Sequence, residues 1–372
     1  MAIGAVTRQF HVSTYTKGLV MQHQDTAHLP TSPLIPTKGA RAVRIWLLII
    51  AAMVYAMILV GGATRLTDSG LSITEWKPVT GSVPPMNADD WQSEFSKYQS
   101  MTAEYRLQNK GMSLNEFKSI YWWEWGHRLL GRLVGVVFLL PFLTFWALGW
   151  TTARLRRRLW ALFVLGGLQG AIGWWMVSSG VGDTHRTDVA AYRLMTHFSL
   201  ALFIIGLSVW VWLELGHRQG DTSSKASRHW SLLLLVLISI QMMFGALVAG
   251  LDAGRTYTDW PLMNGHFIPR YYWDEGGLHN LIENAATTQF NHRTLAYVIL
   301  VLCLIAGWRH ARAAGGWFKW LAIGVVAQSV LGIVTLINAA PLHLGLSHQA
   351  LGTIVLIISI VITKRCFSAE RT

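Results

Sequence analysis

Residues 45–62 read IWLLIIAAMVYAMILVGG and contain no charged side chain. A helix needs about 20 predominantly apolar residues to cross the roughly 30 Å hydrocarbon layer of a bilayer. Further runs of this kind follow at residues 127–149, 160–178, 193–215, 230–250, 290–308, 320–338 and 347–363. Because these runs are too long for barrel strands and lipid cannot satisfy backbone hydrogen bonds, they predict an all-α integral membrane protein with eight transmembrane helices.

The composition agrees with this fold class. Of the 372 residues, 52% are hydrophobic and 13% are charged, whereas ordinary soluble proteins have about 25% charged residues. The first 44 residues lack an apolar run near Met1, which predicts that there is no cleavable signal peptide. Of the two cysteines, Cys303 lies inside an apolar run and Cys366 lies in the tail. Their separate surroundings suggest neither a disulfide nor a thiolate metal site. The composition excludes a soluble enzyme and a disordered chain.

The net charge of +12 reports membrane topology. Eight spans put both termini on one side, and the segments on that side hold 18 Lys and Arg residues against three acidic residues. The positive-inside rule therefore predicts cytoplasmic termini and no nucleic-acid partner. We expect a cytoplasmic N-terminal segment (1–44), a cytoplasmic linker (216–229) and a cytoplasmic tail (364–372). We expect a bacterial inner membrane, with the mitochondrial inner membrane as the alternative.

The two halves of the chain repeat each other. Asp68-Ser-Gly70 followed by Thr74-Glu-Trp76 corresponds to Asp252-Ala-Gly254 followed by Thr258-Asp-Trp260, at a constant offset of 184 residues. Gly61 corresponds to Gly245 at the same offset, and Gln169-x3-Gly173 corresponds to Gln328-x3-Gly332. The repeat predicts two pseudo-symmetric four-helix bundles, residues 45–215 and 230–363, which have parallel topology because four is an even number.

Four of the 14 histidines lie near the starts of predicted spans that run inwards, namely His127, His197, His292 and His348. Ionisable groups within spans are costly and usually face the bundle interior. Two inward histidines on different helices of a four-helix bundle can hold a haem iron from both sides. The pattern therefore predicts one haem site in each bundle. A lone hydrogen-bonded histidine is the alternative at each position, and zinc is a weaker one because neither half offers further ligands.

Glu124 distinguishes the two predicted haem sites. It lies three residues before His127 and therefore on the same helix face, whereas Gln289 occupies the equivalent position in the second half. A carboxylate in such a site is costly unless it has a function or a partner. It could act as a general base or stabilise positive charge on a substrate; the alternative is a structural ion pair with Arg128 or another arginine. We predict chemistry in the first bundle and a resident haem in the second.

Arg128 and Arg293 each follow the first histidine of a pair. Guanidinium groups suit carboxylates, so both arginines could bind haem propionates. They could equally extend to lipid headgroups. The sequence favours neither interpretation.

The outer loop of the first half, residues 63–126, is the longer of the two outer loops. Within it, Ser113 and Glu116 have capping-box spacing, which predicts a helix that runs into the second span. Trp91, Phe95 and Tyr98 form an i, i+4, i+7 stripe, which predicts an interfacial helix resting on lipid. This helix could also cover the first haem site.

The chain contains six polar motifs in order, namely Gly61-Gly-Ala-Thr-Arg65-Leu-Thr-Asp68-Ser-Gly70, Thr74-Glu-Trp-Lys-Pro78, Glu124-Trp-Gly-His127-Arg128, Thr196-His197-Phe, Asn291-His292-Arg293 and Ser347-His348-Gln-Ala-Leu-Gly352. Together these motifs resemble the haem A synthase family. The resemblance extends over residues 41–363, with the motifs in the same order and spacing. Because the first outer loop has no cysteine pair, the chain resembles the cysteine-free branch with mitochondrial and proteobacterial members.

The resemblance implies that haem O is the substrate and that its C8 methyl is oxidised to a formyl group by two successive hydroxylations. The product is haem A for terminal oxidases. The resemblance also implies a substrate haem at His127 and His197, Glu124 as the essential carboxylate, and haem b at His292 and His348. Its expected partners are haem O synthase (protohaem farnesyltransferase), an unidentified electron donor or acceptor, and the lipid bilayer.

Two mechanisms stay open at this point. In an oxygenase route, one histidine must leave the iron to make room for dioxygen. In the other route, electrons are removed from the methyl group while Glu124 supports the cation and water adds to it. The electrons would then pass to the haem of the second bundle.

Two other classes of function compete with this one. A di-haem electron-transfer cytochrome would need no carboxylate beside one haem, so the contrast between Glu124 and Gln289 weakly disfavours it. A transporter built from repeats often has interrupted spans and charges near the bilayer midplane. Here the ionisable residues of the spans cluster towards one surface.

Overall fold

The structure is a computed structural model that describes residues 39–216, 223–274, 276–277 and 279–368. Within these ranges, 8 helices are long and apolar enough to cross a membrane. They are α1 (Ala40–Leu66), α4 (Leu114–Ala147), α5 (Ala153–Val177), α6 (Ala191–Glu214), α7 (Lys225–Gly250), α10 (Ala285–Arg309), α11 (Trp317–Ile337) and α12 (Leu342–Ser368). The same ranges contain isolated bridges but no strand. The predicted eight-helix membrane fold is confirmed.

The other helices are short and lie between the spans. They are η1 (Thr80–Ser82), α2 (Ala88–Met101), α3 (Ala103–Leu107), α8 (Ala253–Thr256), α9 (His279–Glu283) and η2 (Ala313–Gly316). Most of the expected N-terminal segment (1–44), and parts of the expected linker (216–229) and tail (364–372), lie outside the described residues.

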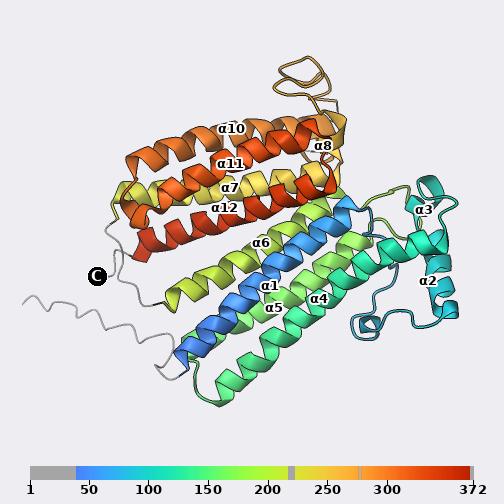
Figure 1. The fold of residues 1–372 in the computed structure, drawn as a ribbon, viewed down its shortest axis with the longest axis horizontal. Coiled ribbons are helices and arrows are strands. Elements are labelled where there is room, and N and C mark those ends of the chain that lie inside the picture. Colours follow the sequence, from blue (N-terminus) through green and yellow to red (C-terminus); the bar gives the residue numbers. More distant parts are fainter. Residues whose placement is uncertain (1–38, 217–222, 275, 278, 369–372) are drawn as a thin grey trace, which may run out of the picture. The chain divides into compact units, whose positions relative to one another are not determined.

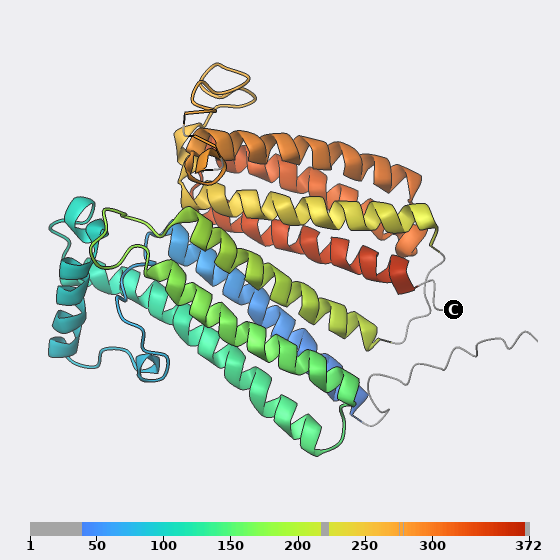
Figure 2. The same cartoon turned by 180° about the vertical axis from the view of Figure 1, so that it is seen from behind.

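The eight long helices form two groups of four (Figures 1 and 2). In the first group, α1 packs on α4 and α6, and α5 packs on α4 and α6. In the second group, α7 packs on α10 and α12, and α11 packs on α10 and α12. The groups meet where α1 and α6 contact α7 and α12. A single cluster of buried apolar side chains, including Leu47, Ile205, Leu234 and Phe318, extends through both groups.

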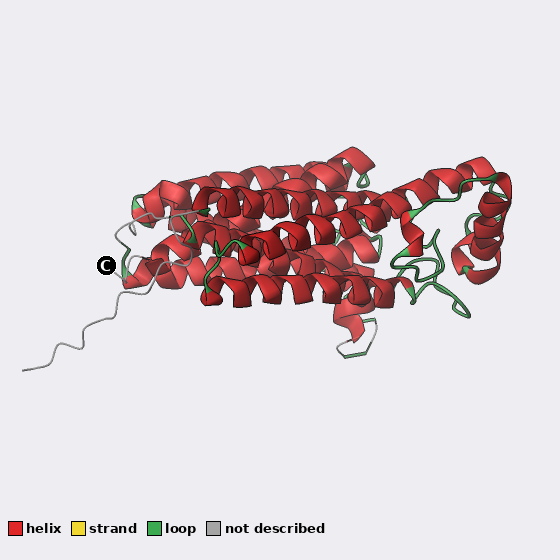
Figure 3. Cartoon of the chain, turned by 90° about the horizontal axis from the view of Figure 1, so that it is seen from below, coloured by secondary structure: helices red, strands yellow, loops and turns green. Residues whose placement is uncertain are grey.

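Helix α4 projects beyond the other spans. The predicted capping box is present: the Ser113 side chain accepts from the Glu116 backbone N–H, and the Glu116 carboxylate accepts from the Ser113 backbone N–H. From this cap, α4 runs through Glu124 and His127 to Ala147 over 34 residues, which is about 51 Å at 1.5 Å per residue. Its first turns therefore extend past the ends of the neighbouring helices (Figure 3).

The projecting end of α4 supports an outer cap built from α2 and α3 (Figure 1). Trp91, Phe95 and Tyr98 on α2 are buried and pack against Phe117 and Tyr121 of α4. Tyr98 has no exposed surface at all. The prediction that this stripe rests on lipid is therefore wrong, because α4 supplies a protein surface that covers it.

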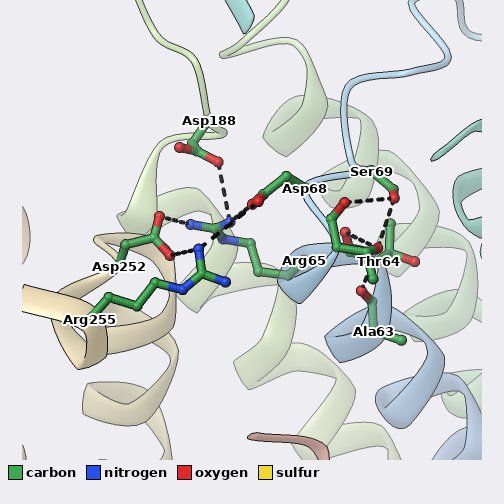
Figure 4. Close-up of polar contacts among 9 residues, drawn as sticks. Ala63, Thr64, Arg65, Asp68, Ser69, Asp188, Asp252 and Arg255 are labelled. Atoms are coloured by element: carbon green, nitrogen blue, oxygen red, sulfur yellow. Dashed lines mark hydrogen bonds and ion pairs between the residues drawn. The ribbon is translucent and has the colours of Figure 1, made fainter. Parts of the chain in front are cut away.

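The repeated aspartates meet at one arginine on α1 (Figure 4). Asp68 and Asp252 each lie two residues after the end of their helix, α1 or α7, in the same left-handed conformation, with φ of 48° and 50°. The Arg65 guanidinium lies 2.9 Å from the Asp68 carboxylate, 2.6 Å from that of Asp252 and 3.2 Å from that of Asp188. Burial raises the pKa of Asp188, and the charge of Arg65 opposes this shift. Arg65 thus joins the first group of helices to the start of the second outer loop.

Candidate functional site

The four histidines singled out from the sequence lie at one end of the spans, two in each group. His127 is on α4, His197 on α6, His292 on α10 and His348 on α12. His197, His292 and His348 lie about two turns inside their helices. The N-terminal ends of α6, α10 and α12 lie at the same end of the molecule, next to the outer loops (Figure 1).

The spacing of His292 and His348 suits a single metal atom between them. Their ring centroids are 6.5 Å apart and their planes are inclined at 70°. Two imidazoles that bind one metal through bonds of about 2.0 Å have centroids about 6.3 Å apart. In the first group, His127 on α4 and His197 on α6 occupy the corresponding positions.

The ligands available match haem iron better than zinc. No group of three or more His, Cys, Asp or Glu side chains is placed to hold a metal within the described ranges. A structural zinc ion needs four protein ligands. Haem iron needs only axial ligands from the protein because the porphyrin supplies the other nitrogens. Two imidazoles in each helix group therefore fit two haems.

Each of the four imidazoles packs against a glycine of a neighbouring helix. A Cβ atom built on that glycine would lie close to the ring, at 3.1 Å for Gly61 and His127, 2.9 Å for Gly173 and His197, 3.3 Å for Gly245 and His292, and 2.9 Å for Gly332 and His348. The repeat had identified these glycines without indicating a role for them. The structure shows that each leaves room for an imidazole.

A glutamine one turn before the glycine also contacts the histidine in three of these four pairs. The side-chain amides of Gln169, Gln241 and Gln328 donate to the backbone carbonyls of His197, His292 and His348 at 3.0, 3.0 and 2.9 Å. The same nitrogens lie between 3.1 and 3.3 Å from the ring nitrogens. The repeat predicted from the sequence paired Gln169 with Gln328 but did not include Gln241. Gln241 has the identical Gln-x3-Gly spacing, and this spacing is the signal that identifies it in the sequence.

The Glu124 carboxylate is buried and fully engaged. One oxygen accepts hydrogen bonds from the Ser72 hydroxyl and the Ile73 backbone N–H, both at 2.7 Å. The other oxygen lies 2.6 Å from the Arg128 guanidinium. The ion pair weighed as an alternative is therefore present, and it holds the outer loop against α4 beside His127.

Gln289 makes the corresponding contacts in the second half, but it donates hydrogen bonds to the outer loop, whereas Glu124 accepts them. Its side-chain amide donates to the carbonyls of Ala253 and Tyr257 at 2.7 and 3.0 Å. Its oxygen accepts from Arg293 at 3.1 Å. The first loop thus presents donors to a carboxylate, whereas the second presents acceptors to an amide. The hydrogen-bonding groups of each loop are therefore complementary to the side chain that they contact, Glu124 or Gln289.

Arg128 and Arg293 clamp the outer loops to the spans. Arg128 donates to the carbonyls of Ile73 and Glu75 at 2.8 and 3.0 Å. Arg293 donates to the carbonyls of Tyr257, Asp259 and Leu262 at 2.9, 2.9 and 3.0 Å. Both guanidinium groups are therefore occupied largely by backbone, and propionate binding by them stays a prediction.

Glu104 is a second buried carboxylate, in the first outer loop, which the sequence had not indicated. It lies on α3 and is 2% exposed. Burial raises its pKa to about 8, while a hydrogen bond with Tyr98 lowers it. One of its oxygens has no hydrogen-bond partner among the described residues. No periodic pattern marked this residue, because α3 is only 5 residues long.

The chain is similar to known proteins over most of its length. A family model described as cytochrome oxidase assembly protein matches residues 44–360. A protein of Hyphomonas neptunium named Heme A synthase is 53% identical over 326 residues, which cover 87% of this chain and 93% of the relative. Proteins of the same name from Dinoroseobacter shibae and Bradyrhizobium diazoefficiens are 48% and 47% identical, covering 88% and 90% of this chain and 90% and 94% of the relatives.

Proposed function

Because the chain belongs to the cytochrome oxidase assembly protein family, we propose that it is a haem A synthase. It is a multi-pass membrane oxidoreductase that converts haem O into haem A for oxidases. The C8 methyl of haem O is oxidised to a formyl group by two successive hydroxylations and loss of water. The observation that carries this proposal is the placement of His292 and His348, whose rings are 6.5 Å apart, as expected for two ligands of one iron.

We assign different roles to the two helix groups. Residues 45–215 take the substrate haem between His127 and His197, and residues 230–363 hold haem b between His292 and His348. The support is a buried charge that differs between the sites: a carboxylate, Glu124, lies one turn from His127, where the second half has the neutral amide of Gln289. When bound, haem b supplies a one-electron redox centre.

Glu124 is the proposed catalytic carboxylate. Its two oxygens already accept from Ser72, Ile73 and Arg128, an arrangement that favours a fixed negative charge over a mobile base. Such a charge stabilises a cation that develops as electrons leave the substrate methyl. Along this route the methyl group and one water give a formyl group, four protons and four electrons. An external electron acceptor would take up these electrons one at a time from haem b. An oxygenase route would instead require a histidine to leave the iron.

The two sites are joined by a close contact between α1 and α12. The Gln349 amide, next to His348, donates to the Ile58 carbonyl at 2.9 Å. A Cβ atom on Gly62 would lie 1.9 Å from the Gln349 side-chain oxygen, so a side chain at this position would displace the Gln349 amide. Gly62 is adjacent to Gly61, which packs on His127. We propose that electrons cross between the helix groups at this contact.

The proposed function also carries proposals about the membrane, the topology, the source of the substrate and the haem propionates. We propose a bacterial inner membrane with both termini cytoplasmic, because the basic residues gather on that side. A haem O synthase is the proposed source of the substrate. Propionate binding by Arg128 or Arg293 would require a propionate to compete with loop carbonyls that these arginines already bind.

Extraction and chromatography of the haems from the purified protein test the proposal. The wild type should contain haem b together with haem O or haem A, and haem b alone would favour the di-haem cytochrome. Glu124→Gln should abolish haem A while both haem sites stay filled. The matched variant Gln289→Glu should keep haem A production, provided that haem b is retained. Unchanged haem A production by Glu124→Gln would contradict the role of the carboxylate.

A further inference from the structure

The ring of His127 is held differently from the other three. Gln169, Gln241 and Gln328 each lie four residues before the glycine that packs on a histidine. On α1, the residue four before Gly61 is Met57. The glycine contact is kept at His127, and the amide contact is not.

Met57 and the three glutamines make different contacts with the neighbouring helix. The Met57 methyl group lies 3.2 Å from the position of a Cβ atom on Gly131, so the side chain packs against α4 one turn beyond His127. The described residues supply no hydrogen bond to the His127 ring. The three glutamines each donate to the carbonyl of their histidine, and the same amide nitrogens lie within 3.3 Å of its ring nitrogens. Their side-chain oxygens are buried without a partner in the part of the chain that the structure describes.

A hydrogen-bonding neighbour changes how firmly a histidine holds a metal. It fixes the tautomer and the ring orientation, and its loss costs about 10–100-fold in metal affinity. Here the glutamine amide donates to the backbone carbonyl of the histidine and lies against its ring, so it restricts the position of the imidazole. A thioether donates nothing and is a weak acceptor. Three of the four ligands therefore have an orienting group that His127 lacks.

We propose that His127 is the exchangeable axial ligand of the substrate haem and that Met57 leaves it free to dissociate. This inference rests on the proposed function and adds to it the identity of the ligand that leaves. His197 stays bound through its contact with Gln169. Release of His127 opens one face of the iron, on the side of Glu124, which lets the substrate haem enter and the product haem leave.

Carbon monoxide binding to the reduced, purified protein tests this inference without using turnover. Carbon monoxide can bind ferrous haem held by two histidines only after one of them has left, and the two haems are distinguished by their absorption bands. In the wild type, the substrate haem should bind carbon monoxide and haem b should not. Met57→Gln should slow binding at the substrate haem by about tenfold or more. Met57→Leu, the matched apolar control, should behave as the wild type.

The reciprocal variant Gln241→Met removes the amide from His292 in the other helix group. It should make haem b reactive towards carbon monoxide, and this result does not depend on how Met57→Gln folds. Equal binding rates in Met57→Gln and the wild type, with both haems present, would overturn the inference and leave the proposed function standing. Wild-type protein that holds haem b alone would overturn both.

Discussion

Replacing Gly173 with alanine would place a methyl group against the imidazole of His197. The new Cβ atom would lie 2.9 Å from Cε1, 3.3 Å from Nδ1 and 3.7 Å from Nε2 of the ring. Carbon atoms in contact are normally about 3.5–4.0 Å apart, so the ring must move by roughly 0.6–1 Å. Metal–ligand distances tolerate only about 0.2 Å. The substitution should therefore displace His197 from any iron that it binds.

The expected cost follows from overpacking. Inserting a methyl group into a packed site costs about 1–3 kcal/mol, which corresponds to a loss of affinity of roughly 5-fold to 150-fold. We expect Gly173→Ala to lose haem O and haem A while it keeps haem b. The mirror variant Gly332→Ala, whose Cβ atom would lie 2.9 Å from Cε1 of His348, should lose haem b.

The assay is extraction and chromatography of the haems, expressed per mole of purified protein. Gly170→Ala is the matched control, because it lies one turn earlier on α5 and its Cβ atom would meet nothing within 4 Å. This control should retain both haems. A Gly173→Ala protein with its full content of haem O or haem A would refute the assignment of His197 as an iron ligand, and so would equal losses of haem in Gly173→Ala and Gly170→Ala.

Two further predictions concern the outer loops. Arg65→Gln should lower the free energy of unfolding by about 1–3 kcal/mol, because it removes the ion pair of Asp188 and leaves Asp252 only its contact with Arg255 at 3.5 Å. Thermal unfolding in detergent measures this, and Asp68→Asn should cost less because Asp68 is 46% exposed. An Arg65→Gln protein as stable as the wild type would show that this cluster does not join the helix groups. Burial raises the pKa of Glu104 from 4.5 to about 8, so the folded protein keeps a proton that the unfolded chain loses. Its contribution to stability is complete below pH 4.5 and is lost as the pH rises to about 8. Glu104→Gln should remove this pH dependence of the unfolding free energy. The same pH dependence in the variant and the wild type would contradict the proposal that Glu104 is protonated in the folded protein.

The sequence was sufficient to predict the membrane spans and the duplication. Lipid imposes length and apolar composition on each helix separately, so runs such as 45–62 can be recognised without knowledge of their neighbours. Motifs such as Asp68-Ser-Gly70 recur because each half folds in the same way, and Asp68 and Asp252 adopt the same backbone conformation. The capping box of α4 was also predictable, since its groups are three residues apart.

The candidate histidines and Glu124 were identifiable because an ionisable residue stands out within an apolar helix. Their partners were not. Glu124 is bound by Ser72 and Ile73, which lie 52 and 51 residues away in the chain, and no local pattern links these segments. The stripe of α2 was misassigned for the same reason, since its covering surface is the projecting end of α4.

The sequence by itself determined which segments cross the membrane, that the two halves are repeats of each other, and which spans contain ionisable side chains that are energetically costly in lipid. These properties depend on local composition and helical periodicity. Only the tertiary structure decided that the ring centroids of His292 and His348 lie at the spacing of two iron ligands, that glycines make room for all four imidazoles, and that arginines hold the outer loops in place. Those properties depend on contacts between helices, which the packing of distant segments creates.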